Sequence, residues 1–172
     1  FDLSMNRDAL QFMLEFGNER RHPASPLFIG GLIGPKNDCY MPAASPAREA
    51  SAAYHSWQID QLAEGGASII VAQTIPSVDE GWGMDDALGR SGVPYVISFV
   101  IDRGGRVLDT TPLDEAIRII DNGTTRPPAG YMVNCVYPTF LHAGDQLPGF
   151  FDRLIGIQAN ASSRDHAQLD GS

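Results

Sequence analysis

The sequence predicts an α/β fold built on a parallel β-sheet. Five short apolar segments alternate with stretches of helical pattern, and successive apolar segments lie roughly 25 to 40 residues apart, the spacing of βα units. The apolar segments are near-continuous hydrophobic runs, the pattern of strands that helices cover on both faces. A closed eight-stranded barrel needs about 250 residues, so a length of 172 residues alone favours a doubly wound open sheet in one domain.

The first predicted elements are a helix and a strand. Leu10, Met13 and Leu14 recur on one face of residues 1–20, which indicates an amphipathic helix. Two prolines then break the helical pattern. Residues 27–33 follow as a buried strand, and a Gly-Pro pair ends it.

A second helix and a second strand come next. Ser45-Pro46 predicts the start of the helix, because a serine hydroxyl can accept hydrogen bonds from free N–H groups and proline suits the first helical turn. The helix should end after Glu64, at Gly65-Gly66. Residues 68–75 form the second buried strand, which a proline ends.

The second half of the chain repeats this alternation. A helix is predicted over residues 79–90, although Gly81 and Gly83 weaken it, and residues 94–101 form the third strand. The remaining predicted elements are a helix opened by Thr111-Pro112 and strands over residues 131–136 and 154–159.

Charge and composition narrow the function classes. The formal net charge is −9, which repels phosphate backbones and anionic lipids, so we expect no nucleic-acid partner and no membrane association. No apolar run approaches the roughly 20 residues of a membrane span, and residues 1–4 lack a signal-peptide pattern. Two cysteines make no disulfide framework and fit a reducing compartment. We therefore expect a cytoplasmic protein that binds small metabolites. Whether it forms a homo-oligomer stays open.

The carboxyl ends of the strands carry the chemistry in both α/β architectures. The polar residues there include few general acids or bases, and no dinucleotide, zinc-protease or nucleophile-elbow motif is present. The four histidines are scattered and are expected outside catalysis. The polar residues that follow the five predicted strands are Lys36, Asn37, Asp38, Cys39, Tyr40, Gln73, Thr74, Ser98, Asp102, Asn134, Cys135, Gln158, Asn160 and Ser162.

Cys135 stands out in this set. A thiol at the end of a buried strand suits a metal ligand or a nucleophile, and it also suits a small buried apolar side chain. One thiolate cannot hold a catalytic zinc ion, which typically has three protein ligands and one open position. These readings of Cys135 stay open on the residues alone.

Several segments, taken in order, resemble the homocysteine S-methyltransferase family. The resemblance covers nearly the whole chain, and its strength lies in the ordered set, since no single motif is diagnostic. The matching segments are Gly31-Leu32-Ile33-Gly34-Pro35, Tyr54-His55, Leu62-Ala63-Glu64-Gly65-Gly66-Ala67, Gln73-Thr74-Ile75-Pro76-Ser77, Gly92-Val93-Pro94-Tyr95-Val96-Ile97-Ser98-Phe99 and Val133-Asn134-Cys135.

The resemblance implies a (β/α)8 TIM-type barrel and so reverses the inference from length. The five strands would be the third to seventh of the barrel, making residues 1–172 a single partial barrel domain. The first two strands would precede Phe1, and the eighth, with a Cys-Cys pair, would follow Ser172. We therefore expect the natural protein to be longer.

The resemblance also implies a reaction and a cofactor. Cys135 matches the family's first zinc cysteine, and zinc would keep the sulfur of homocysteine as a thiolate. That thiolate would attack the methyl group of an onium-type or folate donor to give methionine. Gln73, Thr74, Asn134 and Tyr40 are the expected substrate-binding residues, Asn134 either in support of the site or in contact with substrate.

One position departs from the family pattern. Gln73 replaces the usual glutamate, which is associated with binding the amino group of homocysteine, and a neutral amide loses that charge attraction. Cys39 has no counterpart in the family. Two alternatives therefore stay open: a non-catalytic barrel homologue that binds a small amino acid or sulfur metabolite, and a metal-independent enzyme with an open sheet.

Overall fold

A single parallel sheet organises the molecule. The computed structural model describes residues 4–164, and its five strands lie side by side in chain order, all parallel, as the sequence predicts. The strands are β1 (Gly30–Ile33), β2 (Ile69–Ile75), β3 (Tyr95–Phe99), β4 (Gly130–Val136) and β5 (Leu154–Ala159). Sequential order without a switch is the arrangement of a barrel wall, not of a doubly wound open sheet.

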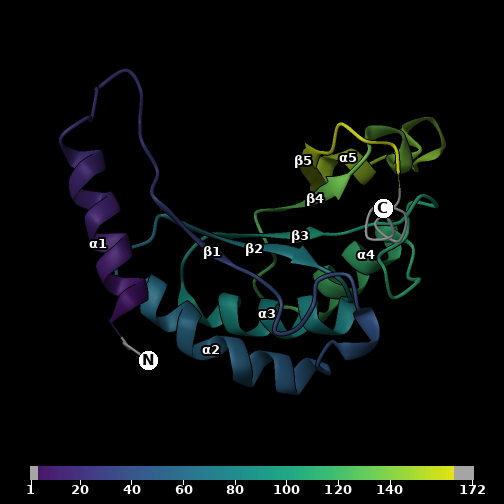
Figure 1. The fold of residues 1–172 in the computed structure, drawn as a ribbon, viewed down its shortest axis with the longest axis horizontal. Helices are drawn as coiled ribbons and strands as arrows, with labels where there is room; N and C mark the ends of the chain where they lie inside the picture. The colour runs from purple at the N-terminus through teal and green to yellow at the C-terminus, as the bar shows by residue number, and fades with distance from the viewer. Residues whose placement is uncertain (1–3, 165–172) are drawn as a thin grey trace.

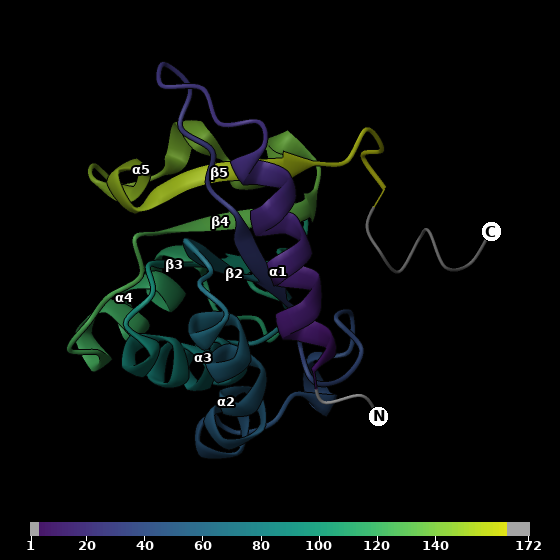
Figure 2. The same ribbon diagram turned by 90° about the vertical axis from the view of Figure 1, so that its left-hand side faces the viewer.

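The helices lie mainly on one face of this sheet. Figure 1 shows α2, α3 and α4 along one side, while β4 and β5 curve away toward the other side. Figure 2, turned by 90°, shows α1 running across the strands. The helices are α1 (Met5–Asn18), α2 (Arg48–Glu64), α3 (Val78–Ser91), α4 (Leu113–Gly123) and the short α5 (Phe150–Arg153), with 3-10 turns η1 (Pro42–Ala44), η2 (Pro138–Leu141) and η3 (Ala143–Asp145).

The start of α2 differs from the prediction. Ser45-Pro46 does not open the helix: Ser45 is extended and closes η1, and α2 begins at Arg48 with Ala47 as its N-cap. The residues just before the helix belong to the 3-10 turn, so the Ser45 hydroxyl does not cap the first helical N–H groups. The predicted end at Glu64 is confirmed, because Gly65 caps the helix and the following glycine has a positive φ.

Burial of the strands is less symmetric than predicted. Every residue of β3 is buried, but β1 alternates, with Leu32 61% exposed and Ile33 fully buried, and most of β5 is exposed. Within residues 4–164 the middle strand β3 is buried along its whole length, while the edge strands β1 and β5 are partly exposed. The face of the sheet opposite the helices, called the concave face below, is therefore open at the two edge strands.

The glycines of α3 permit close packing, although they were expected to weaken the helix. A Cβ added at Gly83 would lie 2.2 Å from the carbonyl oxygen of Arg48, and one at Gly81 would lie 3.0 Å from the Phe99 ring. A Cβ at Gly83 would overlap the backbone of α2, whereas one at Gly81 would require the Phe99 ring to shift by a few tenths of an ångström. The two glycines therefore let α3 pack closely against α2 on one side and against the sheet on the other.

Candidate functional site

Asn134 joins three neighbouring strands at their carboxyl ends. Its Oδ1 accepts hydrogen bonds from the Thr74 backbone N–H at 3.0 Å and from the Ser98 hydroxyl at 2.7 Å. Its Nδ2 donates to Thr74 Oγ1 at 2.8 Å. Asn134 and Ser98 are each 1% exposed, so these bonds form away from water, where an unpaired amide would be costly.

Cys135 is directed by the same amide. Asn134 Nδ2 lies 3.3 Å from Cys135 Sγ and donates to it, and the cysteine is half-buried. A weak S-acceptor bond of this kind orients the sulfur without closing access to it. The predicted placement of Asn134 beside Cys135 at the end of β4 is therefore observed.

Two residues of the site have left-handed backbone conformations. Thr74 has φ 64° and Cys135 has φ 55°, and the strand register shifts at both places. Such a conformation costs a non-glycine residue about 1–3 kcal/mol and persists only where the surroundings impose it. The hydrogen bonds of Asn134 hold the Thr74 backbone in this conformation. The distortion of both strands points to a functional use.

Gln73 meets a residue that the sequence analysis had not assigned to the site. Its Nε2 donates to the side-chain oxygen of Gln158 on β5, across the concave face. Gln73 and Gln158 come from strands that β3 and β4 separate, so the bond spans the curve of the sheet. Gln158 was recognisable only as a polar residue at a strand end.

A cavity of about 450 Å³ opens beside Thr74 and Gln73. The loop after β1 forms its other wall and contributes Cys39, while Tyr40 next to it is 38% exposed and does not line the cavity. The lining residues are Leu32, Ile33, Gly34, Pro35, Asn37, Asp38, Cys39, Gln73 and Thr74. A second hollow of about 470 Å³ lies between the loops that follow β3 and β4, and no cysteine lines it.

A buried carboxylate anchors the loop after β1, which forms one wall of the cavity beside Thr74 and Gln73. Glu80 of α3 is fully buried, and its Oε1 accepts from the Lys36 backbone N–H at 2.6 Å and faces His55 Nε2 at 3.3 Å. Burial would raise the pKa of Glu80, but the hydrogen bonds with His55 and Lys36 outweigh it and lower the pKa below its ordinary value. His55 was expected to lie outside catalysis, and in the structure it is buried beside Glu80 as part of this support.

The described residues fit a zinc ion only in part. Cys135 offers a soft, oriented thiol of the kind that zinc binds. Residues 4–164 contain no group of three or more His, Cys, Asp or Glu side chains that could hold a metal ion. Cys135 can therefore serve as one ligand of such a site, and this part of the chain does not complete it.

Fold and site together define a barrel-type α/β protein with a thiol at the strand ends. Solved structures of the homocysteine methyltransferase MmuM from Escherichia coli have the same fold. The metallated form matches at a TM-score of 0.70 with 20% identity, over 98% of this chain and 70% of that chain. The oxidised form matches at a TM-score of 0.71 with 18% identity, over 98% of this chain and 70% of that chain. The apo form matches at a TM-score of 0.67 with 19% identity, over 99% of this chain and 76% of that chain.

The family model for homocysteine S-methyltransferases matches residues 2–170, and the chain belongs to this family. Its sheet is accordingly part of a TIM-type barrel, as the resemblance implied. A comparison with curated proteins gives no match. None of the helices over residues 4–164 is long and apolar enough to cross a membrane.

Proposed function

We propose that this chain carries part of the active site of a zinc-dependent homocysteine S-methyltransferase. The observation that supports this most directly is the oriented thiol of Cys135 at the end of β4, in a chain of this family. Cys135 would be one zinc ligand, and the others would come from residues beyond 4–164. When bound, zinc supplies the positive charge that keeps a ligand thiol deprotonated near neutral pH.

The proposed reaction transfers a methyl group from an onium-type or folate donor to homocysteine. The sulfur of homocysteine forms a new bond to the methyl carbon as the bond between that carbon and the donor breaks, and the product is methionine. No protein base has to remove a proton during the transfer. The small number of acid–base side chains at the strand ends agrees with this chemistry.

The substrate-binding roles belong to residues around the cavity. Gln73 would accept a hydrogen bond from the amino group of homocysteine, and Thr74 would form the wall beside it. Asn134 would keep Cys135 aligned. Tyr40 would cover the site from the loop after β1, next to the lining residue Cys39.

The test is the zinc content of protein purified without chelators, followed by thermal melting with homocysteine. We expect bound zinc in the protein with its complete set of ligands, and stabilisation by homocysteine only when zinc is present. Cys135→Ser should abolish both effects, while Gln73→Glu, which restores the family residue, should strengthen the response to homocysteine. Zinc-independent stabilisation that survives Cys135→Ser would contradict the proposal.

A non-catalytic homologue that binds a small amino acid or sulfur metabolite is the second candidate. The neutral Gln73–Gln158 pair favours it, because two amides can bind polar groups of a ligand without the charge attraction of a glutamate. A folded, full-length protein that binds homocysteine without zinc and transfers no methyl group would support this second function.

A further inference from the structure

A glutamine side chain can bind an amine with only one of its two amide ends. The carbonyl oxygen accepts a hydrogen bond, whereas the NH2 group donates and would turn its own hydrogens toward an ammonium group. A half-turn of the amide exchanges the two ends without changing the shape of the side chain. The proposed role of Gln73, to accept a hydrogen bond from the amino group of homocysteine, therefore requires an amide held in one orientation.

Gln158 holds the Gln73 amide in the required orientation. Gln73 Nε2 donates to the side-chain oxygen of Gln158, so the NH2 end is directed toward β5, across the concave face. Among residues 4–164, no group donates a hydrogen bond to Gln73 Oε1. That oxygen can therefore accept a hydrogen bond from a ligand in the cavity that Gln73 lines.

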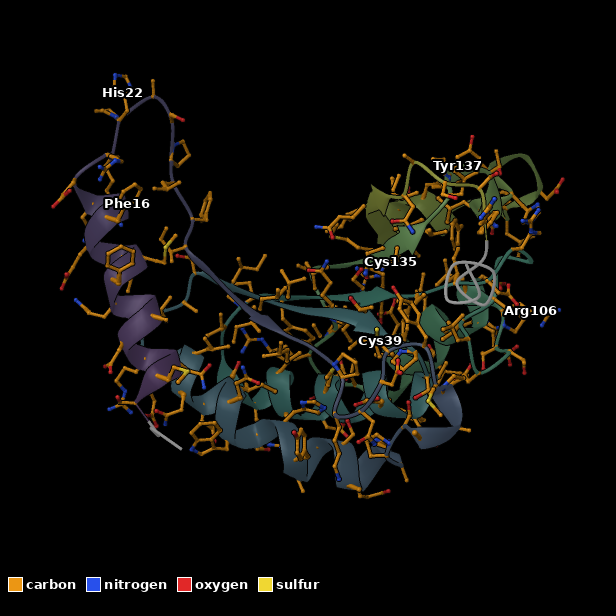
Figure 3. All side chains as sticks on the ribbon, viewed as in Figure 1. Phe16, His22, Cys39, Arg106, Cys135 and Tyr137 are labelled. Atoms are coloured by element: carbon orange, nitrogen blue, oxygen red, sulfur yellow. The ribbon has the colours of Figure 1, made fainter. Side chains whose placement is uncertain are left out.

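The backbones that carry the two amides are both tied to Asn134. Gln158 lies beside Asn134 in the register of β4 and β5. Asn134 Oδ1 also accepts from the backbone N–H of Thr74, the residue that follows Gln73, at 3.0 Å. Figure 3 labels Cys135, which marks this end of β4 near the middle of the molecule. The bond between the two amides thus starts from two strand ends that a buried residue already holds.

We propose that Gln158 is a positioning residue, which turns the carbonyl oxygen of Gln73 toward the amino group of the substrate. The proposal rests on the proposed function, from which it takes the role of Gln73. Gln158 is exposed and does not line the cavity, so it acts through the Gln73 amide without touching the substrate. The pair would favour thiols that carry an amino group over thiols that lack one.

Loss of the bond would lower the fraction of molecules in which Gln73 can bind the substrate. A released glutamine side chain can turn its amide either way and occupies several rotamers. Methionine keeps the unbranched shape of glutamine but offers only a weakly accepting sulfur. Because the apparent dissociation constant rises as the competent fraction falls, Gln158→Met should weaken homocysteine binding about three- to tenfold.

The test is calorimetric titration of the full-length protein, with and without zinc, using homocysteine and γ-mercaptobutyrate. The second compound has the same thiol and carboxylate but no amino group, so it makes no use of the Gln73 oxygen. Gln158→Met should weaken the binding of homocysteine and leave the binding of γ-mercaptobutyrate unchanged. Gln11→Met, the same change at an exposed position of α1, should alter neither and is the control.

The same titrations with Gln73→Glu separate positioning from a merely structural role. Both oxygens of a carboxylate accept hydrogen bonds, so its orientation needs no partner. Gln158→Met should therefore have little effect on homocysteine binding once Gln73→Glu is present. Gln158→Glu, which keeps an oxygen that can accept from Gln73 Nε2, should lose no more than about twofold in affinity.

The outcomes separate this inference from the proposed function. Unchanged homocysteine binding in Gln158→Met, equal losses for the two thiols, or equal losses with and without Gln73→Glu would each overturn the positioning role and leave the role of Gln73 standing. Wild-type protein that binds both thiols equally tightly would refute the role of Gln73 itself, and the inference with it.

Discussion

Replacing Asp85 with asparagine should stabilise the protein at pH 8 but not at pH 4. Asp85 of α3 is fully buried, and its Oδ1 accepts from the Tyr95 hydroxyl at 2.6 Å, while Oδ2 has no hydrogen-bond partner within residues 4–164. The same hydroxyl lies 2.5 Å from the Arg126 carbonyl, so two acceptors share one proton. Burial raises the pKa of Asp85 from 3.8 to about 6.

The magnitude follows from that pKa. A pKa raised by about 2 corresponds to about 3 kcal/mol. Because the folded protein holds the Asp85 proton more tightly than the unfolded chain, stability falls as the pH rises from about 4 to about 6, and the full penalty is present above that range. Asparagine removes the charge but places an N–H where Oδ2 lacks a partner, which costs about 1–2 kcal/mol. The net gain at pH 8 is about 1–2 kcal/mol.

Urea denaturation of wild type and Asp85→Asn at pH 8 and pH 4 measures this effect. The free energy of unfolding of the variant, relative to wild type, should change by about 2–3 kcal/mol between the two pH values, whatever the cost of the new N–H group. Asp60→Asn, an exposed change on α2, is the matched control and should show no such dependence. An effect of Asp85→Asn that is the same at both pH values would refute the reasoning.

Three further predictions concern the supports of the site. Asn134→Ala should lower the free energy of unfolding by about 2–4 kcal/mol, because it leaves the buried Thr74 N–H and Ser98 hydroxyl without their acceptor. The same change should alter the alkylation rate of Cys135, and an unchanged rate would argue against the orienting role of Asn134. Glu80→Ala should free the Lys36 amide and speed hydrogen exchange in the loop after β1, whereas unaltered exchange would show that the loop is held elsewhere. Gly83→Ala should destabilise the protein by about 1–3 kcal/mol in thermal or urea unfolding, while Gly144→Ala, in open space, should not.

The fold was predictable because its signals are local. Each strand is a run of adjacent apolar residues, and the segment over residues 154–159 is observed with the predicted bounds. The end of α2 at Glu64 follows from the glycines beside it. The start of α2 was mispredicted because a serine–proline pair also suits the 3-10 turn that precedes the helix. The barrel-type arrangement came from the family resemblance, since length alone favoured another architecture.

The site was predictable only where it depends on neighbours in sequence. Cys135 and Asn134 are adjacent, so a single strand end placed both. The partner of Gln73 lies 85 residues away, and His55 is 25 residues from Glu80. No local pattern links positions so far apart, and only the curvature of the sheet and the packing of α2 on α3 bring them together.

The hydrogen bond between Gln73 and Gln158 makes the curvature of the sheet responsive to what binds on its concave face. The two amides meet across β3 and β4, so the bond forms only while the strands keep their present bend. A small molecule that inserts between the amides exchanges this bond for its own, and its binding free energy then includes any change in the bend. Such a ligand would alter hydrogen exchange along the outer strands, at residues that it never touches.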